Sequence, residues 1–295
     1  MIVTDCGSKN YIFREYVSDP RNRYDSFIPI FLFYGGFMKE KILIVDGHNL
    51  LFKMYYGIPN SIRRNGVEIK GVIGFIGVLL KLSTQFNSYS IIVVFDSETS
   101  TEENKRIDAF YKSNRPDYSK IEDNPFTQLQ MIKNCLNYLK IFNLECSHYE
   151  ADDYIASLCE QLQKDYSIVI VSTDKDFFQL VNENILVYQY YGKKSVLYGV
   201  KEVQERYGVA PMQFPLYLSI VGDTSDHVIG VRGIGPKKVI KVLNDNDFLN
   251  KFKDTIQTNL TLVTLNKKIN INNFSIRKLK LTDITVNQII NTVLK

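Results

Sequence analysis

The ten residues Ser167–Asp176, which read SIVIVSTDKD, join a continuous apolar run to two acids that follow it closely. A short run rich in valine and isoleucine is typical of a strand in the buried middle of a parallel sheet. Two similar runs precede it, namely Lys41–Val45 followed by Asp46 and Ile91–Phe95 followed by Asp96. Because open α/β sheets bind their ligands beyond the carboxyl ends of the strands, these acids predict a site at that edge.

Segments with helical periodicity separate the three apolar runs. Residues 70–86 carry apolar side chains at spacings of three and four, and a second apolar-periodic segment begins after Glu150. Strands that alternate with helices predict a doubly wound parallel sheet of the α/β class. From about Lys201 the pattern changes to short helices, predicted at Lys201–Tyr207, Pro211–Val221 and Pro236–Leu243, with a lysine-rich helical segment over 265–295.

The stretch Tyr149–Ala156, which reads YEADDYIA, places three carboxylates within four residues. Carboxylates this close repel one another unless a cation lies between them, and carboxylate oxygens are usual ligands of magnesium. The alternative is helix capping, because acids at a helix start accept hydrogen bonds from free N–H groups and suit the helix dipole. The recurrence of acids at the other strand ends favours the metal site over capping.

Two further acids, Asp223 and Asp226, come three residues apart where the preceding predicted helix ends, which places both on one side of that helix end. The segment Gly230–Lys238, GVRGIGPKK, follows them. Glycines before a helix let backbone N–H groups approach a phosphate, and the helix N-terminus favours the anion. With its terminal lysine pair, this segment suits sequence-independent contact with a DNA backbone.

The composition is that of an ordinary soluble protein, because 45% of the 295 residues are hydrophobic and 23% are charged. The net charge of +4 is unremarkable, but without the nine acids of these motifs the remainder of the chain carries +13. A basic body around an acidic pocket suits a polyanionic substrate. The cysteines show no paired spacing, which is typical of reduced thiols in a cytoplasmic protein; they are Cys6, Cys135, Cys146 and Cys159.

Residues 1–37 do not resemble the rest of the chain. Their apolar run Phe27–Phe37 is too short to span a bilayer and lacks the small-residue cleavage site of a signal peptide. We interpret this segment as an extension ahead of a natural start at Met38, and a genuine accessory segment is the alternative. The predicted domains are therefore an extension over 1–37, a catalytic domain over 38–200 and a helical domain over 201–295.

The hydrophobic pattern collapses between Thr99 and Pro125, where charged residues crowd a stretch with few aliphatic side chains. Such a segment is either a solvated loop or an element that meets substrate. Its stretch Tyr111–Arg115, YKSNR, sets an aromatic ring beside cations, a combination that stacks on bases and binds phosphate.

Seven short motifs together resemble the 5′ nuclease family over roughly Lys39 to Leu243. The family includes the N-terminal domain of bacterial DNA polymerase I, stand-alone bacterial 5′–3′ exonucleases, phage exonucleases and flap endonucleases. The matching motifs, in the family's order, are Val45–Gly47, Val93–Asp96, Tyr111–Pro116, Tyr149–Asp153, Ser172–Asp176, Gly222–Asp226 and Gly230–Gly235. The bacterial branch is the most similar, and since no polymerase portion follows the motifs, we expect a stand-alone enzyme.

The resemblance implies a PIN-like α/β domain with a helical arch over the active site, followed by a smaller helix–three-turn–helix domain that binds duplex DNA. Carried over by position, it implies that one metal ion is surrounded by Asp46, Asp96, Glu150, Asp152 and Asp153. A second ion would be lined by Asp174, Asp176, Asp223 and Asp226. The expected ions are two Mg²⁺, for which Mn²⁺ can substitute, and a K⁺ in the helix–three-turn–helix loop.

The resemblance also assigns roles to the polar segment, where Lys112 and Arg115 would neutralise charge on the scissile phosphate and Tyr111 would stack on the terminal base. The residues expected to contact DNA are Lys53, Gly233, Gly235, Lys237 and Lys238. The expected substrate is DNA with 5′ ends, flaps or nicks, with RNA–DNA hybrids left open, cut to 5′-phosphorylated products in replication or repair. We expect a monomer that needs neither a membrane nor a small-molecule substrate.

Two positions depart from the family pattern. His227 stands where Asn is usual after the last acid, and Asn104, beside Lys105 and Arg106, stands where an arginine is usual. We expect His227 to tune the site, while the identity of the arch cation stays open. Two other functions compete: a PIN-class ribonuclease would need neither the last two acids nor the glycine-lysine segment, and a non-catalytic junction binder would need no complete acid set.

Overall fold

The computed structural model describes residues 39–97, 121, 123–146, 148–272, 274, 276–279, 281 and 283–294 of the chain. The predicted extension over 1–37 lies outside this range, as does nearly all of the polar segment that contains Tyr111, Lys112 and Arg115. The arch expected from the family resemblance therefore lies outside the described residues.

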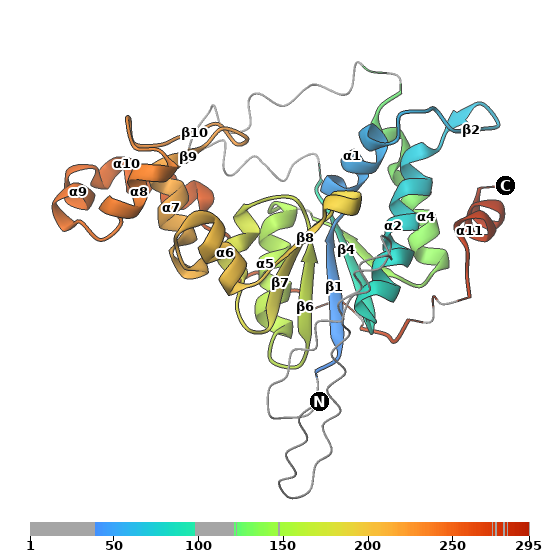
Figure 1. Ribbon diagram of the computed structural model, residues 1–295. Coiled ribbons are helices and arrows are strands. Elements are labelled where there is room, and N and C mark those ends of the chain that lie inside the picture. Colours follow the sequence, from blue (N-terminus) through green and yellow to red (C-terminus); the bar gives the residue numbers. More distant parts are fainter. Residues whose placement is uncertain are drawn as a thin grey trace, which may run out of the picture. The chain divides into compact units, whose positions relative to one another are not determined.

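A six-stranded sheet with the order β5-β4-β1-β6-β7-β8 forms the centre of the fold (Figure 1). Five strands are parallel, and only the last of these six, β8, runs antiparallel to its neighbour β7. The mainly parallel α/β sheet predicted from the three apolar runs is thereby confirmed. The strands are β1 (Lys41–Asp46), β4 (Ser90–Phe95), β5 (Phe142–Glu145), β6 (Ser167–Val171), β7 (Ile185–Gln189) and β8 (Val196–Tyr198).

Both faces of the sheet are covered, which explains why its strands are apolar without alternation. On β1, Ile42 and Ile44 pack on one face with helix α5 (Ala151–Leu162). Leu43 and Val45 pack on the other face with the helices α1 (Gly47–Gly57), α2 (Lys70–Phe86) and α4 (Leu129–Tyr138). Strand β1 lies between β4 and β6, so the strand order reverses there, and open α/β sheets bind their ligands at the carboxyl ends of the strands at such a point.

The chain is mostly helical from residue 200 to residue 263. Helices α7 and α10 pack against each other, and the core that they share continues into the α5 face of the sheet. The helices are α6 (Val200–Tyr207), α7 (Phe214–Val221), α8 (Pro236–Val242), α9 (Asn246–Lys251) and α10 (Lys253–Val263), and the predicted helices in this region agree with α6, α7 and α8. The shorter elements are η2 (Pro125–Gln128), η3 (Asp176–Leu180), η4 (Gly192–Lys194), η5 (Pro211–Gln213), and the strand pairs β2 (Arg63–Arg64) with β3 (Val67–Glu68) and β9 (Gly222–Asp223) with β10 (Val228–Ile229).

The prediction of a helical segment over 265–295 is wrong for most of its length. Among its described residues the only helix is α11 (Val286–Val293), which packs on α2 and α4. The part before α11 is rich in asparagine and β-branched residues, which form poor helices. The described residues between 264 and 284 are not helical, and we call them the strap. Two of their amide groups bond to the sheet domain: Asn266 N–H to Asp153 and Leu279 N–H to the Tyr89 carbonyl.

Candidate active site

Asp46 is the last residue of β1 and also the N-cap of α1, so the strand and the helix together fix its carboxylate. Its Oδ1 accepts a hydrogen bond from the Asn49 N–H at 3.0 Å, and its Oδ2 accepts one from the Ser172 hydroxyl at 2.9 Å. Burial raises the pKa of Asp46 to about 6; the charges of Asp96 and Asp174 add to this effect, and the two hydrogen bonds oppose it. The effect of these two charges on Asp46 indicates that acids from β1, β4 and the loop after β6 lie close together.

Asp96, directly after β4, is fixed from two sides. Its Oδ1 accepts the N–H of Ala151, the first residue of α5, at 2.8 Å. Its own N–H donates to His48 Nδ1 at 3.0 Å. Because Nδ1 accepts this hydrogen bond, it is not a donor to Asp96 Oδ2, which lies 3.6 Å away.

The three carboxylates that begin α5 have different surroundings. Glu150 is buried at the N-cap position, yet within the described residues its side chain does not cap the helix, and Asp96 takes that role from across the sheet. The capping alternative therefore does not account for Glu150. Asp153 Oδ1 accepts the Asn266 N–H at 2.8 Å. Asp152 and Asp153 both lie near the buried Cys146, whose pKa is raised by burial and, further, by these charges.

The loop after β6 is tied to α1 and to itself. Asn49 Oδ1 accepts both the N–H and the hydroxyl of Thr173, each at 3.0 Å. Asp174 N–H donates to Ser172 Oγ at 3.1 Å, and Asp174 Oδ1 accepts the Asp176 N–H at 2.9 Å. We call Asp46, Asp96 and Asp174 the sheet-edge group, because each lies at or just beyond the carboxyl end of a parallel strand.

Asp223 and Asp226 are not on a helix end, so that prediction is wrong. Helix α7 ends at Val221, and the chain turns at once into the hairpin β9–β10. Gly222, with a φ of 85°, and Gly230 make this possible. A Cβ on Gly222 would meet Gly230 N at 2.5 Å, and a Cβ on Gly230 would meet the Val221 carbonyl oxygen at 2.4 Å. The two backbone segments approach each other here at a distance that only glycine allows.

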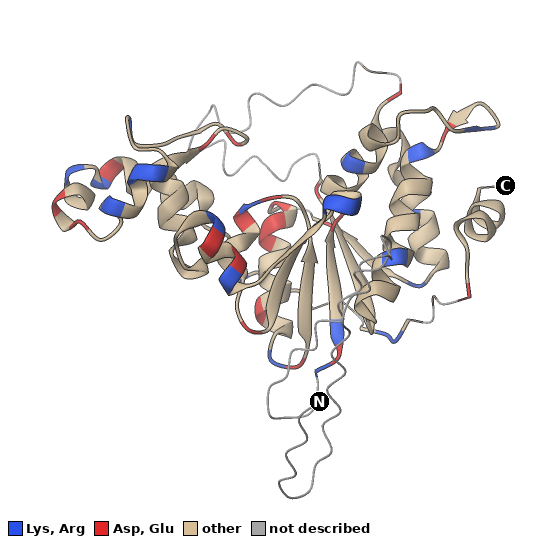
Figure 2. Cartoon of the chain, in the orientation of Figure 1, with Lys and Arg blue, Asp and Glu red and all other residues tan. Residues whose placement is uncertain are grey.

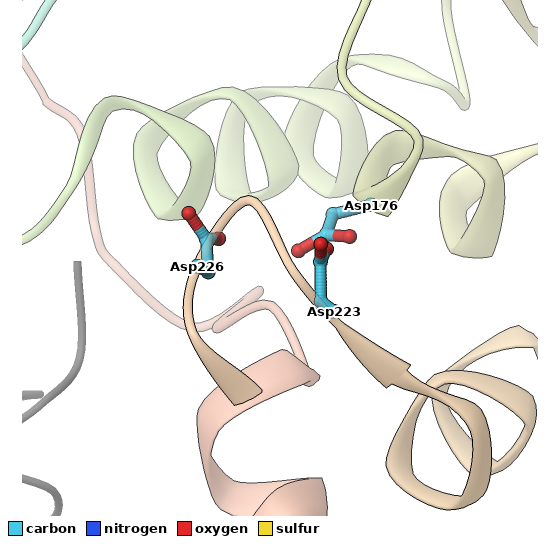
Figure 3. A group of neighbouring side chains, drawn as sticks. All are labelled: Asp176, Asp223 and Asp226. Carbon is cyan, nitrogen blue, oxygen red and sulfur yellow. The ribbon is translucent and has the colours of Figure 1, made fainter. Parts of the chain in front are cut away.

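The hairpin brings its two acids to Asp176 of η3, and we call these three residues the three-aspartate cluster. All three are buried, and each offers a carboxylate oxygen within 4.8 Å of the others (Figure 3). Burial raises the pKa of Asp176 well above its usual range, and the charges of Asp174, Asp226 and Asp223 raise it further. Within the described residues, Asp176 Oδ1 has no hydrogen-bond partner. Crowded carboxylates with an unsatisfied buried oxygen suit a divalent cation with oxygen ligands.

Asp223 has the opposite environment although it belongs to the same cluster. Its Oδ1 accepts hydrogen bonds from the N–H and the hydroxyl of Ser225, and the Lys175 ammonium lies 2.9 Å from the same oxygen. Burial alone would raise the pKa of Asp223, but these bonds and the lysine charge outweigh burial and hold it below its usual range.

Comparisons with known proteins agree with this geometry. The family model of the 5′-3′ exonuclease N-terminal resolvase-like domain matches residues 41–208. A 5′-3′ exonuclease of Aquifex aeolicus is 36% identical over 205 residues, which cover 69% of this chain and 69% of that protein. The chain belongs to the 5′-3′ exonuclease family. The prediction that it is a nuclease is confirmed.

Further similar proteins are larger or less similar in sequence. DNA polymerase I of Deinococcus radiodurans is 35% identical over 213 residues, which cover 72% of this chain but only 21% of the polymerase. The flap endonuclease of bacteriophage T5, solved with DNA and metal ions, has a TM-score of 0.63 at 22% identity, over 77% of this chain and 90% of that one. Human GEN1, solved with Holliday junction DNA, has a TM-score of 0.53 at 15% identity, over 86% and 68%. These two likenesses support the fold.

The residues expected to contact DNA lie in two places on this exonuclease fold. Lys53 of α1 lies over the ring of Tyr191, 3.6 Å from its centre, beside the Thr173 loop. The others form the loop before α8 and its first turn, where Figure 2 shows basic residues. There Gly233 has a φ of 82°, and Lys238 Nζ donates to the Gly233 carbonyl at 3.0 Å. Gly235 is the N-cap residue of α8, and Lys237 is exposed.

Sequence reasoning did not single out the residues that hold the acids. Ser172 and Lys175 lie inside the motif Ser172–Asp176, and Asn49 lies two residues after the motif Val45–Gly47. Their contacts with the acids and the acidic loop depend on how distant segments meet. A polar side chain within three residues of a predicted ligand is the signal that could have marked them. His227 has a φ of 63°, a left-handed conformation that Asn and His adopt more readily than most residues, which explains why one can replace the other. In the part of the chain that the structure describes, no helix is long and apolar enough to cross a membrane.

Proposed function

We propose that this chain is a metal-dependent 5′-3′ exonuclease that also cuts 5′ flaps, and that it hydrolyses DNA phosphodiester bonds. The observation that carries the proposal is the meeting of acids from five separate segments, between Asp46 and Asp226, around one edge of the sheet. The similarity to an exonuclease of Aquifex aeolicus and to a flap endonuclease of bacteriophage T5 supports the same reaction.

Two groups of acids would hold two Mg²⁺ ions, with Mn²⁺ as a substitute. The first group comprises Asp46, Asp96, Glu150, Asp152 and Asp153, and the second comprises Asp174, Asp176, Asp223 and Asp226. Divalent cations bound there would supply a water of lowered pKa and neutralise charge on the scissile phosphate. The unsatisfied Oδ1 of Asp176 and the crowding in the three-aspartate cluster fit such ions. A K⁺ in the loop before α8 is a further part of the proposal.

The chain's own residues would position the reacting groups. Hydrogen bonds from Asn49, Ser172 and Ala151 hold Asp46 and Asp96 in place before any substrate arrives, so little reorganisation is needed during reaction. Lys112 and Arg115 would neutralise the charge that develops on the phosphate, and Tyr111 would stack on the terminal base; all three lie outside the described residues.

The protein would bind DNA through the sugar-phosphate backbone and the strand ends. Lys53, beside the Thr173 loop, would contact the strand near the cleavage site, and Lys237 and Lys238 would hold the downstream duplex without reading bases. The proposed partners are DNA with 5′ ends, flaps or nicks, and RNA–DNA hybrids as a second substrate. We place this activity of a cytoplasmic monomer in replication or repair, with 5′-phosphorylated products.

The test is cleavage of a 5′-labelled flap and of a nicked duplex, each with Mg²⁺ and with EDTA. Metal-dependent release of short 5′-phosphorylated products is expected on both substrates. Absence of cleavage with binding retained would indicate a junction-binding protein, and preference for structured RNA would indicate a ribonuclease. Lys112→Ala should slow cleavage far more than it weakens binding, and normal cleavage by this variant would contradict its assigned role.

A further inference from the structure

Lys175 is a cation placed between two acids of the site, Asp174 and Asp176, on the loop that follows β6. Its side chain does not turn to solvent but crosses to the hairpin, where Nζ lies 2.9 Å from Asp223 Oδ1. About a third of the lysine side chain is exposed, whereas the Asp223 side chain is 2% exposed. The ammonium therefore contacts the three-aspartate cluster while part of the lysine side chain stays exposed to solvent.

The groups that contact the Asp223 carboxylate reach the same oxygen. The two hydrogen bonds from Ser225 and the ion pair with Lys175 all converge on Oδ1. The Ser225 donors belong to the hairpin itself and are fixed by its turn. The lysine contact is different in kind, because it is made by a compact charge on a flexible four-carbon stem that can leave for solvent.

The charge of the cluster explains why a cation is needed there. Three buried carboxylates lie within 4.8 Å of one another, and the cluster also carries an oxygen of Asp176 without a hydrogen-bond partner among the described residues. Their mutual repulsion is unfavourable unless a positive charge is near. Lys175 supplies one positive charge, where a divalent ion would supply two.

We propose that Lys175 is a resident counter-cation of this site, which competes with a divalent ion for Asp223 and sets how tightly that ion binds. The inference rests on the proposed function, because it takes the three-aspartate cluster to be the second metal site. When a divalent ion enters, the ammonium leaves Asp223 for solvent. The lysine thus keeps the empty cluster compact, and it lowers the cluster's affinity for metal.

The test is Mn²⁺ binding to the full chain without DNA, followed by the EPR signal of free Mn²⁺. Lys175→Met keeps the side-chain length and removes the charge, so one Mn²⁺ site should bind about tenfold more tightly, with the number of sites unchanged. Lys164→Met is the matched control, since Lys164 is exposed and lies just before the amino end of β6, at the opposite edge of the sheet. It should bind Mn²⁺ as the unaltered chain does.

Unchanged or weaker Mn²⁺ binding by Lys175→Met would overturn the inference, because weaker binding would mean that the lysine organises Asp223 for the ion. A second measurement needs no substitution: crystals of the unaltered chain grown with and without Mn²⁺. With Mn²⁺ the distance from Lys175 Nζ to Asp223 Oδ1 should exceed the roughly 4 Å limit of an ion pair. A lysine that stays in place beside bound Mn²⁺ would also overturn it.

These outcomes are separable from failure of the proposed function. If the unaltered chain neither binds Mn²⁺ at Asp176 and Asp223 nor cuts a 5′ flap, the proposed function fails and the inference fails with it. If it binds and cuts while Lys175→Met matches it in affinity, only the inference about Lys175 fails.

Discussion

The sheet-edge group and the three-aspartate cluster are both made of aspartates, but their oxygens are satisfied differently. In the sheet-edge group, Asp46 accepts hydrogen bonds on both oxygens, and Asp96 and Asp174 each accept a backbone N–H. In the cluster, Asp223 gathers its donors on one oxygen, while Asp176 has a buried oxygen with no partner in the described chain.

This difference separates two ways of building a metal site. The sheet-edge acids are held by neighbours that the α/β fold supplies anyway, such as a helix N-cap and the first N–H of α5. The cluster depends on a hairpin from the second half of the chain, and its repulsion is relieved only in part by protein groups. The sheet edge is therefore preorganised, and the cluster is the part that a cation should change most.

The largest expected effect comes from the loop that joins both groups. Asp174→Asn combined with Asp176→Asn should lower the rate of flap cleavage by about 10³-fold or more, because it removes ligands and charge at the reacting phosphate. Binding of the flap should stay within a few-fold of normal, measured by fluorescence anisotropy. Asp247→Asn, an exposed change on α9, is the control. A double variant that still cuts at the normal rate would remove both acids from the mechanism.

Within the cluster, Asp176 and Asp223 should respond to neutralisation with opposite signs. In EDTA at pH 7.5, Asp176→Asn relieves repulsion and should stabilise the fold by about 1 kcal/mol. Asp223→Asn leaves Lys175 and Ser225 with a weaker acceptor and should destabilise it by about 1–2 kcal/mol. Urea unfolding measures both values. Changes of the same sign would show that the two carboxylates do not differ in the way their contacts indicate.

The contribution of Asp46, in the sheet-edge group, to the stability of the fold should depend on pH. The pKa of Asp46 is about 6 in the folded chain, above its ordinary value of 3.8, so the folded state binds this proton more tightly. Its contribution to stability is fully present below 3.8 and is lost as the pH rises through 6. Between pH 7.5 and 5, the metal-free chain should therefore gain roughly 1 kcal/mol relative to Asp46→Asn. Parallel pH profiles for the two proteins would contradict a raised pKa for Asp46.

A change outside both groups should have the smallest effect. Lys238→Ala removes an exposed cation of α8 and should weaken duplex binding by only a few-fold, with the slope of log affinity against log salt reduced by about 1. The cleavage rate at saturating DNA should not change. Lys164→Ala should alter neither quantity. A loss of maximal rate in Lys238→Ala would mean that this loop does more than hold DNA.

The sheet and its acids could be predicted because their signals are local. Apolar runs of β-branched residues specify β1, β4 and β6, and parallel strands bring their carboxyl ends to one edge, so Asp46, Asp96 and Asp174 had to meet. Helix α2 was predicted with its observed bounds because its periodicity is unbroken from residue 70 to 86.

What the sequence did not reveal depends on contacts between distant segments. Asp223 and Asp226 were predicted at a helix end, and nothing in the local sequence indicates that Gly222 and Gly230 approach each other so closely. The partner of Asp153 lies on the strap, at Asn266, which no spacing rule connects with it. The lysine-rich segment 265–295 was predicted to be helical, whereas among its described residues only α11 is a helix.

The close approach of Gly222 and Gly230 has a consequence for the sequence changes that this loop can accept. Residues 223–229 form a loop whose two ends are held together by this approach. We expect one residue more or less in the loop to turn Asp226 outward while Asp223 stays in place. We therefore expect substitutions inside the loop to preserve the position of Asp226, and changes of length to disturb it. Among homologous genomes, a gap or insertion at this loop should therefore mark lineages in which the nuclease has decayed, even where every acid remains.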